Sequence, residues 1–176
     1  MYQESDHYTV LLTFSINDSL SFSSSGYSQL RTREGVRYYY YNDLGPRAGN
    51  CTWGVGTLAH FGICTEDELK RSVSSTDVNN ALAKHVQKLE RYLGRKVNKH
   101  PLTQAQFYGL ISFSYNVSDP SPVMELANRG DMDGVRKSML KYVYVFNHDK
   151  NGKKVGPPRL LPALYRRRLE ESSAFK

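Results

Sequence analysis

Apolar residues recur along most of the chain at the spacing of an amphipathic helix. The clearest series has members three or four positions apart and consists of Val78, Leu82, Val86, Leu89 and Leu93. Thr76 before this series and Gly94 after it predict a helix that begins and ends near those two residues. A capping box of Thr103 and Gln106 predicts a second helix, which carries Phe107, Leu110, Ile111 and Tyr115.

Two later segments also have a helical pattern. One apolar stripe consists of Val135, Met139, Leu140 and Val143. Pro162 suits the first turn of a final helix that continues through Glu171. The chain after residue 56 is therefore predicted to be helical throughout.

The front of the chain has a different pattern. A short helix is expected from Tyr27 to Glu34, ended by Gly35. Extended segments follow at 36–41 and 51–56, and the loop between them contains glycine and proline, which predicts a small antiparallel hairpin sheet. The fold class is therefore α+β, with a small sheet near the front and a mainly helical body.

Residues 1–26 are rich in Ser, Thr and aromatic residues. Segment 8–14 alternates loosely, as a strand would, while residues 17–18 and 23–26 are predicted to form turns. We interpret residues 1–26 as an N-terminal arm without an assigned role and residues 27–176 as one domain.

Composition is typical of an ordinary globular protein. The 176 residues suit a single domain, and 39% of them are hydrophobic and 23% charged. No apolar run approaches the roughly 20 residues that a membrane-spanning helix needs. The apolar stretch near the start lacks the basic region and cleavage site of a signal peptide, so we expect synthesis in the cytoplasm without one.

The charge balance favours a polyanionic partner. There are 24 basic and 17 acidic residues, which gives a net charge of +7. Nucleic acid, lipopolysaccharide and the acidic polymers of a bacterial wall all attract a basic protein. The one dense basic run, residues 166–168, lies on the predicted final helix. The sequence shows none of the motifs of nucleic-acid-binding modules, so no nucleic-acid partner is expected.

Two carboxylates are placed for glycosidic chemistry. Glu34 ends the first predicted helix, and Asp43 follows nine residues later in the hairpin. Glycosidases use one carboxyl group that stays protonated to donate to the leaving oxygen and one that stays ionised to activate water or attack. Because the chain has 17 acidic residues, spacing alone leaves open that both are solvated surface groups.

Three blocks of sequence resemble the phage-type lysozymes, glycoside hydrolase family 24. The first contains Glu34-Gly35-Val36-Arg37, Tyr41-Asn42-Asp43 and Ala48-Gly49-Asn50-Cys51-Thr52-Trp53-Gly54-Val55-Gly56, and it is similar to the active-site signature of that family. Residues 101–117 resemble its central helix and residues 161–171 its final helix. The resemblance covers about residues 27–173 and implies a lysozyme-like fold with a cleft between sheet and helical body.

The resemblance implies a bacteriolytic muramidase that hydrolyses the β-1,4 bonds between N-acetylmuramic acid and N-acetylglucosamine in peptidoglycan. It makes Glu34 the general acid, Asp43 the residue that activates the attacking water, and Thr52 a second partner of that water. Such a reaction inverts the configuration at the sugar. We assign substrate binding to Tyr41, Trp53 and Asn116. Arg166 or Arg167 is expected to orient Glu34 by planar pairing.

The sequence departs from the family pattern at two places. Eight residues separate Asp43 from Thr52, more than the family usually has, and the longer loop could displace Thr52 or reshape the cleft. The residue after Gly56 is commonly histidine in the family and is Thr57 here, with His60 as one residue that could replace it.

Cys51 and Cys64 are the only cysteines, and the five histidines show no ligand spacing, so we expect neither a metal nor a cofactor. The two cysteines by themselves are also consistent with a pair of buried free thiols. The family resemblance favours a disulfide between them.

Two alternatives to an active muramidase stay open. One is a catalytically weak domain that binds peptidoglycan, and the other is a basic nucleic-acid binder. As a muramidase the protein would act as a monomer on the wall in the bacterial periplasm. It would be a phage endolysin released by a holin-dependent route, or an antibacterial effector with an immunity or inhibitor protein as partner.

Overall fold

A computed structural model of the chain describes residues 15–148 and 154–176, so the strand expected at 8–14 lies outside the described residues. Helix α1 (Ser24–Glu34) leads into an antiparallel sheet with the strand order β1 (Arg37–Asn42), β2 (Cys51–Gly54), β3 (Thr57–His60). The helices α2 (Glu66–Leu69), α3 (Ser75–Lys96), α4 (Gln104–Asn116), α5 (Ser121–Asn128) and α6 (Met132–Met139) follow. The chain ends with a hairpin of β4 (Tyr144–His148) and β5 (Lys154–Leu160), helix α7 (Pro162–Glu171) and the short 3-10 helix η1 (Ser172–Ala174).

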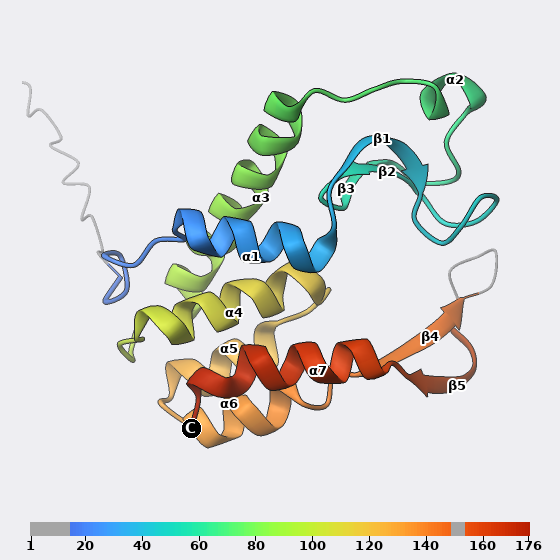
Figure 1. Cartoon of the computed structure of the whole chain (residues 1–176). Helices are drawn as coiled ribbons and strands as arrows, with labels where there is room; N and C mark the ends of the chain where they lie inside the picture. The colour runs from blue at the N-terminus through green and yellow to red at the C-terminus, as the bar shows by residue number, and fades with distance from the viewer. Residues whose placement is uncertain (1–14, 149–153) are drawn as a thin grey trace, which may run out of the picture.

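The predicted α+β class is confirmed. In Figure 1 the β1–β3 sheet stands at one end of the molecule, helices α4 to α7 form the body, and α3 runs between the two. Helix α1 crosses the body and ends where the sheet begins. None of the helices in the described part of the chain is long and apolar enough to cross a membrane.

Helix α1 begins earlier than predicted. The turn expected at 23–26 is wrong, because the Ser23 side chain accepts a hydrogen bond from the backbone N–H of Gly26 and residues 24–26 form the first helical turn. Serine is among the best N-cap residues, and its hydroxyl satisfies a donor that the first turn leaves free. Gly35 ends the helix as predicted.

Helix α3 also differs from its predicted bounds. Ser74, not Thr76, caps its N-terminus, and the helix runs past Gly94 to Lys96. Gly94 does not end the helix because Leu93 and Val97, on either side of it, are completely buried in the core. Their packing outweighs the cost of a glycine inside a helix, about 1 kcal/mol.

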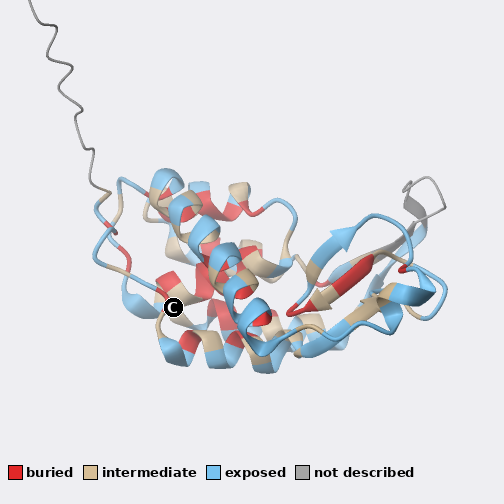
Figure 2. Cartoon of the chain, turned by 90° about the horizontal axis from the view of Figure 1, so that it is seen from above, coloured by how far each residue is buried: buried red, intermediate tan, exposed pale blue. Residues whose placement is uncertain are grey.

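Helix α4 is the centre of the body. Its predicted capping box is confirmed, since Thr103 and Gln106 each accept a hydrogen bond from the other's backbone N–H. A Cβ atom on Gly109 would lie 2.5 Å from the carbonyl oxygen of Glu171, so only glycine lets the end of α7 pack this closely on α4. Figure 2 shows the buried residues on the inner sides of the body helices and along β2.

The expectation that the chain is helical after residue 56 is wrong for β4 and β5. These strands pair antiparallel, with Tyr144 opposite Leu160 and Val145 opposite Arg159. Pro157 and Pro158 argue against a central strand, but a hairpin of two strands consists only of edges, where proline is tolerated. The predicted apolar stripe is correspondingly shorter, because α6 ends at Met139.

Candidate active site

Glu34 is the last residue of α1 and lies where the helical body meets the sheet. Its side chain is 18% exposed, and its Oε1 atom lies 2.7 Å from Nη2 of Arg167 on α7. The same oxygen is buried and accepts no well-aligned hydrogen bond from the described residues. The contact with Arg167 is therefore an ion pair that orients the carboxyl group.

Arg167 is itself held in place by two helices. Its Nε donates to Oε1 of Glu171 at 2.8 Å, and its Nη2 donates to the backbone oxygen of Ser112 on α4 at 3.1 Å. Only 11% of its side chain is exposed. The planar guanidinium has little freedom to rotate, so Glu34 meets a fixed partner.

Glu171 is the buried centre of this network, with a side chain that is 0% exposed. The Ser112 hydroxyl donates to its Oε1 at 2.6 Å, and Arg168 forms an ion pair with its Oε2. Arg168 is 1% exposed and also donates to the backbone oxygen of Tyr142 at 3.1 Å. One buried carboxylate therefore serves two buried guanidinium groups.

Asp43 lies in the β1–β2 loop and is exposed. Its Oδ1 accepts a hydrogen bond from the backbone N–H of Asn50 at 2.8 Å, and the Asp43 N–H donates to the Asn50 carbonyl at 3.1 Å. Gly49 permits this closure, because a Cβ atom there would lie 1.9 Å from the Asp43 carboxylate. The extra residues of the loop are thus confined between Asp43 and Asn50.

Thr52 keeps its place in the sheet despite the longer loop. It lies directly opposite Tyr41 in the β1–β2 pairing, it is 4% exposed, and its hydroxyl donates to the Asn50 carbonyl at 3.3 Å. With the longer loop in place, Thr52 is paired within the sheet. The loop bulges outward beyond the Asp43–Asn50 closure.

Three side chains with shifted pKa values are influenced by the charge of Glu34. Burial raises the pKa of the Tyr41 phenol, and the negative charges of Asp43 and Glu34 raise it further. Burial and the charge of Glu34 also raise the pKa of Tyr115, whose hydroxyl donates to the backbone oxygen of Val55 at 2.5 Å. Burial lowers the pKa of His85, which stacks on the Tyr115 ring at 4.5 Å.

Sequence reasoning missed several of these neighbours. Tyr115 was predicted only as a helix position, and His85 was grouped with histidines that lack ligand spacing. Ser112 and Glu171 join the network through contacts between α4 and α7, which no spacing along the sequence indicates. The basic run at 166–168 was the only signal that pointed to this network.

The other residues that the sequence predicted have different contacts. Trp53 follows Thr52 in β2 and so faces the opposite side of the sheet, where it packs 6.3 Å from Tyr40 beside a pocket of about 380 Å³. Asn116 accepts a hydrogen bond from Arg168. Arg166 is exposed, so Arg167 alone of the two pairs with Glu34.

The sheet carries a cross-link near these residues. Cys51 and Cys64 form a disulfide, as the family resemblance implies. His60, proposed as a replacement for the missing histidine after Gly56, forms an ion pair with Glu68 at 3.0 Å and so ties β3 to α2.

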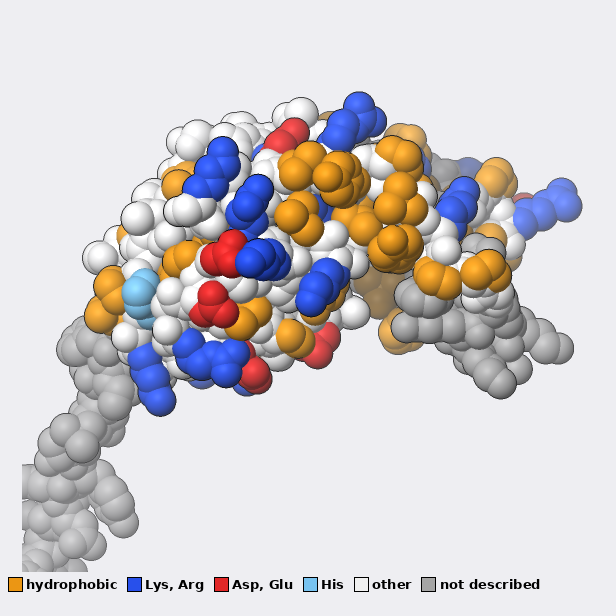
Figure 3. All heavy atoms as spheres, turned by 90° about the horizontal axis from the view of Figure 1, so that it is seen from below, with side chains coloured by type: hydrophobic (Ala, Val, Ile, Leu, Met, Phe, Trp, Pro, Cys, Tyr) orange, Lys and Arg blue, Asp and Glu red, His pale blue; other side chains and the backbone are white. Residues whose placement is uncertain are grey.

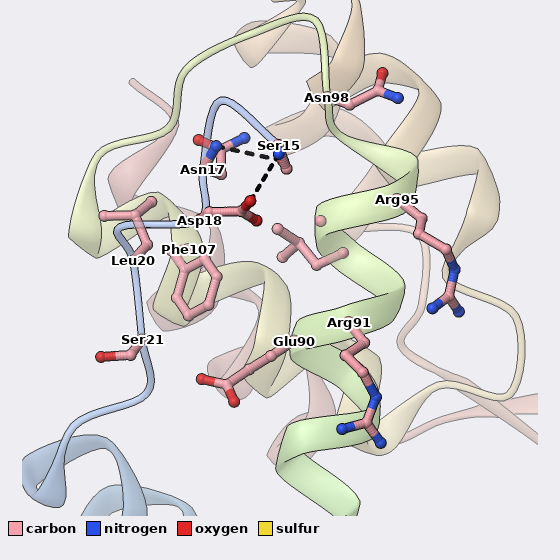
Figure 4. Close-up of a pocket in the computed structure, with 12 residues that line it drawn as sticks. Ser15, Asn17, Asp18, Leu20, Ser21, Glu90, Arg91, Arg95, Asn98 and Phe107 are labelled. Atoms are coloured by element: carbon pink, nitrogen blue, oxygen red, sulfur yellow. Dashed lines mark hydrogen bonds between the residues drawn. The ribbon is translucent and has the colours of Figure 1, made fainter. Parts of the chain in front are cut away.

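A pocket of about 510 Å³ lies outside this region (Figure 4). Asp18 of the segment before α1, Arg91 and Arg95 of α3 and Phe107 of α4 are among the residues that line it. Neither Glu34 nor any other residue of the network around it lines this pocket, so it is not part of the candidate active site.

The positive charge is dispersed on the face shown in Figure 3. Lys and Arg side chains are scattered there among other residues, and some of them lie next to Asp or Glu. This face therefore has no continuous basic stripe of the kind that tracks a nucleic-acid backbone.

Comparisons with known proteins identify the family of the chain. The sequence matches the phage lysozyme family over residues 31–171. No curated protein matches the chain in a sequence comparison.

Three similar solved structures share the fold. The muramidase domain of SpmX from Asticcacaulis excentricus is 24% identical, with a TM-score of 0.66 over 89% of this chain and 97% of that domain. An endolysin from Escherichia coli O157:H7 phage FAHEc1 is 24% identical, with a TM-score of 0.64 over 89% and 93% of the two chains. The active form of the P1 phage endolysin Lyz is 17% identical, with a TM-score of 0.62 over 87% and 83%.

The network predicts very different effects for two neighbouring glutamates. Glu171→Gln should lower the free energy of unfolding by about 3–5 kcal/mol, because it leaves the buried Arg168 without a carboxylate. Glu170, which is 62% exposed and pairs with Arg33, is the matched control, and Glu170→Gln should cost less than about 1 kcal/mol. Urea denaturation measures both, and equally small losses would show that the network contributes little stability.

Proposed function

Because the chain belongs to the phage lysozyme family, we propose that it hydrolyses the β-1,4 bond between N-acetylmuramic acid and N-acetylglucosamine, with Glu34 as general acid. The family makes it a glycoside hydrolase of the lysozyme type, which acts on peptidoglycan. The observation that carries the residue assignment is the ion pair between Glu34 and Arg167, which fixes a mostly buried carboxyl group at the edge of the sheet.

Arg167 holds the Glu34 carboxyl group in one orientation. Arg167 is itself fixed by an ion pair with Glu171, so the two contacts together set the direction in which Glu34 points. Arg167 is therefore a positioning residue, and Glu34 delivers its proton to the oxygen of the leaving sugar.

Asp43 is suited to the complementary role. The N–H of Asn50 donates to its carboxylate and fixes its position, and its exposure gives water access. Asp43 would take a proton from a water molecule as that water attacks the anomeric carbon on the face opposite the leaving group. The Thr52 hydroxyl gives its proton to the Asn50 carbonyl, so its oxygen can accept a hydrogen bond from the same water.

The site of action follows from the substrate. We place the activity at the wall in the bacterial periplasm, where a phage endolysin and an antibacterial effector would both use this hydrolysis.

Glu34→Gln tests the proposed acid. Glutamine keeps the size of the side chain but has no proton to donate, so the rate of wall lysis should fall by at least about a hundredfold. Loss of turbidity of purified walls measures the rate, and a thermal melt of each preparation shows whether the variant is folded.

Glu66→Gln is the control, because Glu66 is exposed on α2, and it should lyse walls at the parent rate. A folded Glu34→Gln variant with nearly parental activity would rule out the acid role.

The role of Asp43 determines the stereochemistry of the product. If Asp43 activates water, the new reducing end should first appear with inverted configuration. Proton NMR of a soluble glycan substrate, recorded before mutarotation, identifies the first anomer. Retained configuration, or a covalent sugar on Asp43, would contradict the water-activating role.

A further inference from the structure

A second cluster of side chains able to bind a ligand lies where β3 ends. Donor atoms of Cys51, His60 and Glu68 lie within 4.8 Å of one another, and Cys64 is bonded to Cys51. Across the residues that the structure describes, this is the one group of three such side chains that could hold a metal ion. Sequence spacing did not predict it, because the hairpin and α2 bring these residues together.

We propose that reduction of the Cys51–Cys64 disulfide converts this cluster into a binding site for a zinc-class divalent cation. The ligands are the two thiolates, a ring nitrogen of His60 and a carboxylate oxygen of Glu68. A thiol or phosphine reductant supplies two electrons, and two protons complete the thiols. The cation then displaces one proton from each thiol and one from the protonated His60 ring as these three groups bind it.

The donor set suits zinc. Two sulfurs, one nitrogen and one oxygen make a four-coordinate tetrahedral shell, with bonds of about 2.0–2.3 Å and hence ligand atoms about 3.3–3.8 Å apart. The Nε2 of His60 and the Oε1 of Glu68 are 3.0 Å apart, and the widest separation in the group is within 4.8 Å. These three donors therefore need shifts on the order of 1 Å to reach that spacing. Cys64, which is bonded to Cys51, becomes available as the fourth ligand once the disulfide opens.

The disulfide and the cation exclude each other. Metal binding needs thiolates, and sulfurs bonded to one another carry no such charge. The His60–Glu68 ion pair is the part of the site that exists in the oxidised protein.

Hydrogen bonds keep the donors together after the disulfide opens. The Cys51 N–H donates to the Gly62 carbonyl at 2.7 Å, and the Cys64 N–H donates to Oδ1 of Asn42 at 2.7 Å. Glu68 is fixed by the capping box of α2, in which the Thr65 N–H donates to its Oε2 at 2.8 Å. None of these bonds depends on the disulfide.

Replacement of the disulfide by a bound cation would keep Cys51 and Cys64 joined in both oxidising and reducing environments. A disulfide persists in an oxidising compartment, and a metal clamp would replace it where thiols are kept reduced. Cys51 directly precedes Thr52, so either clamp holds the strand that carries a proposed catalytic residue. The site goes beyond the lysozyme function and does not depend on it.

Cobalt(II) absorption tests the site in the unmodified chain. The protein is reduced with a phosphine, freed of reductant under anaerobic conditions and titrated with Co²⁺. We expect thiolate-to-cobalt charge-transfer bands and tetrahedral ligand-field bands that saturate at one equivalent, and displacement by Zn²⁺. The oxidised protein should show neither set of bands. Absence of the bands after reduction, or equal bands before it, would overturn the proposal.

Variants test the other two ligands. His60→Ala and Glu68→Gln should each weaken Co²⁺ binding by at least about tenfold. His100→Ala and Glu66→Gln are the matched controls and should leave it unchanged. Binding as tight in His60→Ala and Glu68→Gln as in the parent would mean that the thiols bind alone, which would overturn the four-ligand site.

Discussion

The buried carboxylate of Glu171 is the interaction on which the candidate active site depends. It lies between Arg167 and Arg168, and its own position is set by the close packing of α7 on α4 at Gly109. Two buried guanidinium groups without this counter-charge would each carry a desolvation penalty of several kcal/mol. Because Glu171 supplies this counter-charge, Arg167 can be mostly buried and present one fixed edge of its guanidinium group to Glu34. Glu34, the proposed acid, is therefore positioned by the balance of charge between Glu171 and the two arginines.

On the sheet side of the site, hydrogen bonds that close the β1–β2 loop take the place of ion pairs. Asp43 is fixed by Asn50 through hydrogen bonds that fold the longer loop away from the strands. Thr52 lies opposite Tyr41, and the disulfide at Cys51 holds the same end of this strand. The Glu34 carboxyl group is thus positioned by buried charge and the Asp43 carboxyl group by a tight turn.

Local signals predicted most of the fold. The capping box at Thr103 can be recognised from the sequence and marks the start of a helix. The continuation of α3 beyond Gly94 depends on contacts in the core, which cannot be recognised from the sequence. The β4–β5 hairpin was missed because its prolines argue against a strand and only its edge position permits them. Family resemblance identified Glu34 and Asp43. The role of Glu171 and the position of His85 could not be predicted, because both depend on how helices pack.

Chemical analysis of the products is the most direct test of the central claim. Purified peptidoglycan is digested, the new chain ends are reduced with borohydride, and the fragments are identified by mass spectrometry. Hydrolysis of the proposed bond leaves every new reducing end on N-acetylmuramic acid, which the reduction converts to its sugar alcohol. New ends on N-acetylglucosamine, or anhydro ends formed without uptake of water, would contradict a hydrolytic muramidase that works through Glu34 and an activated water.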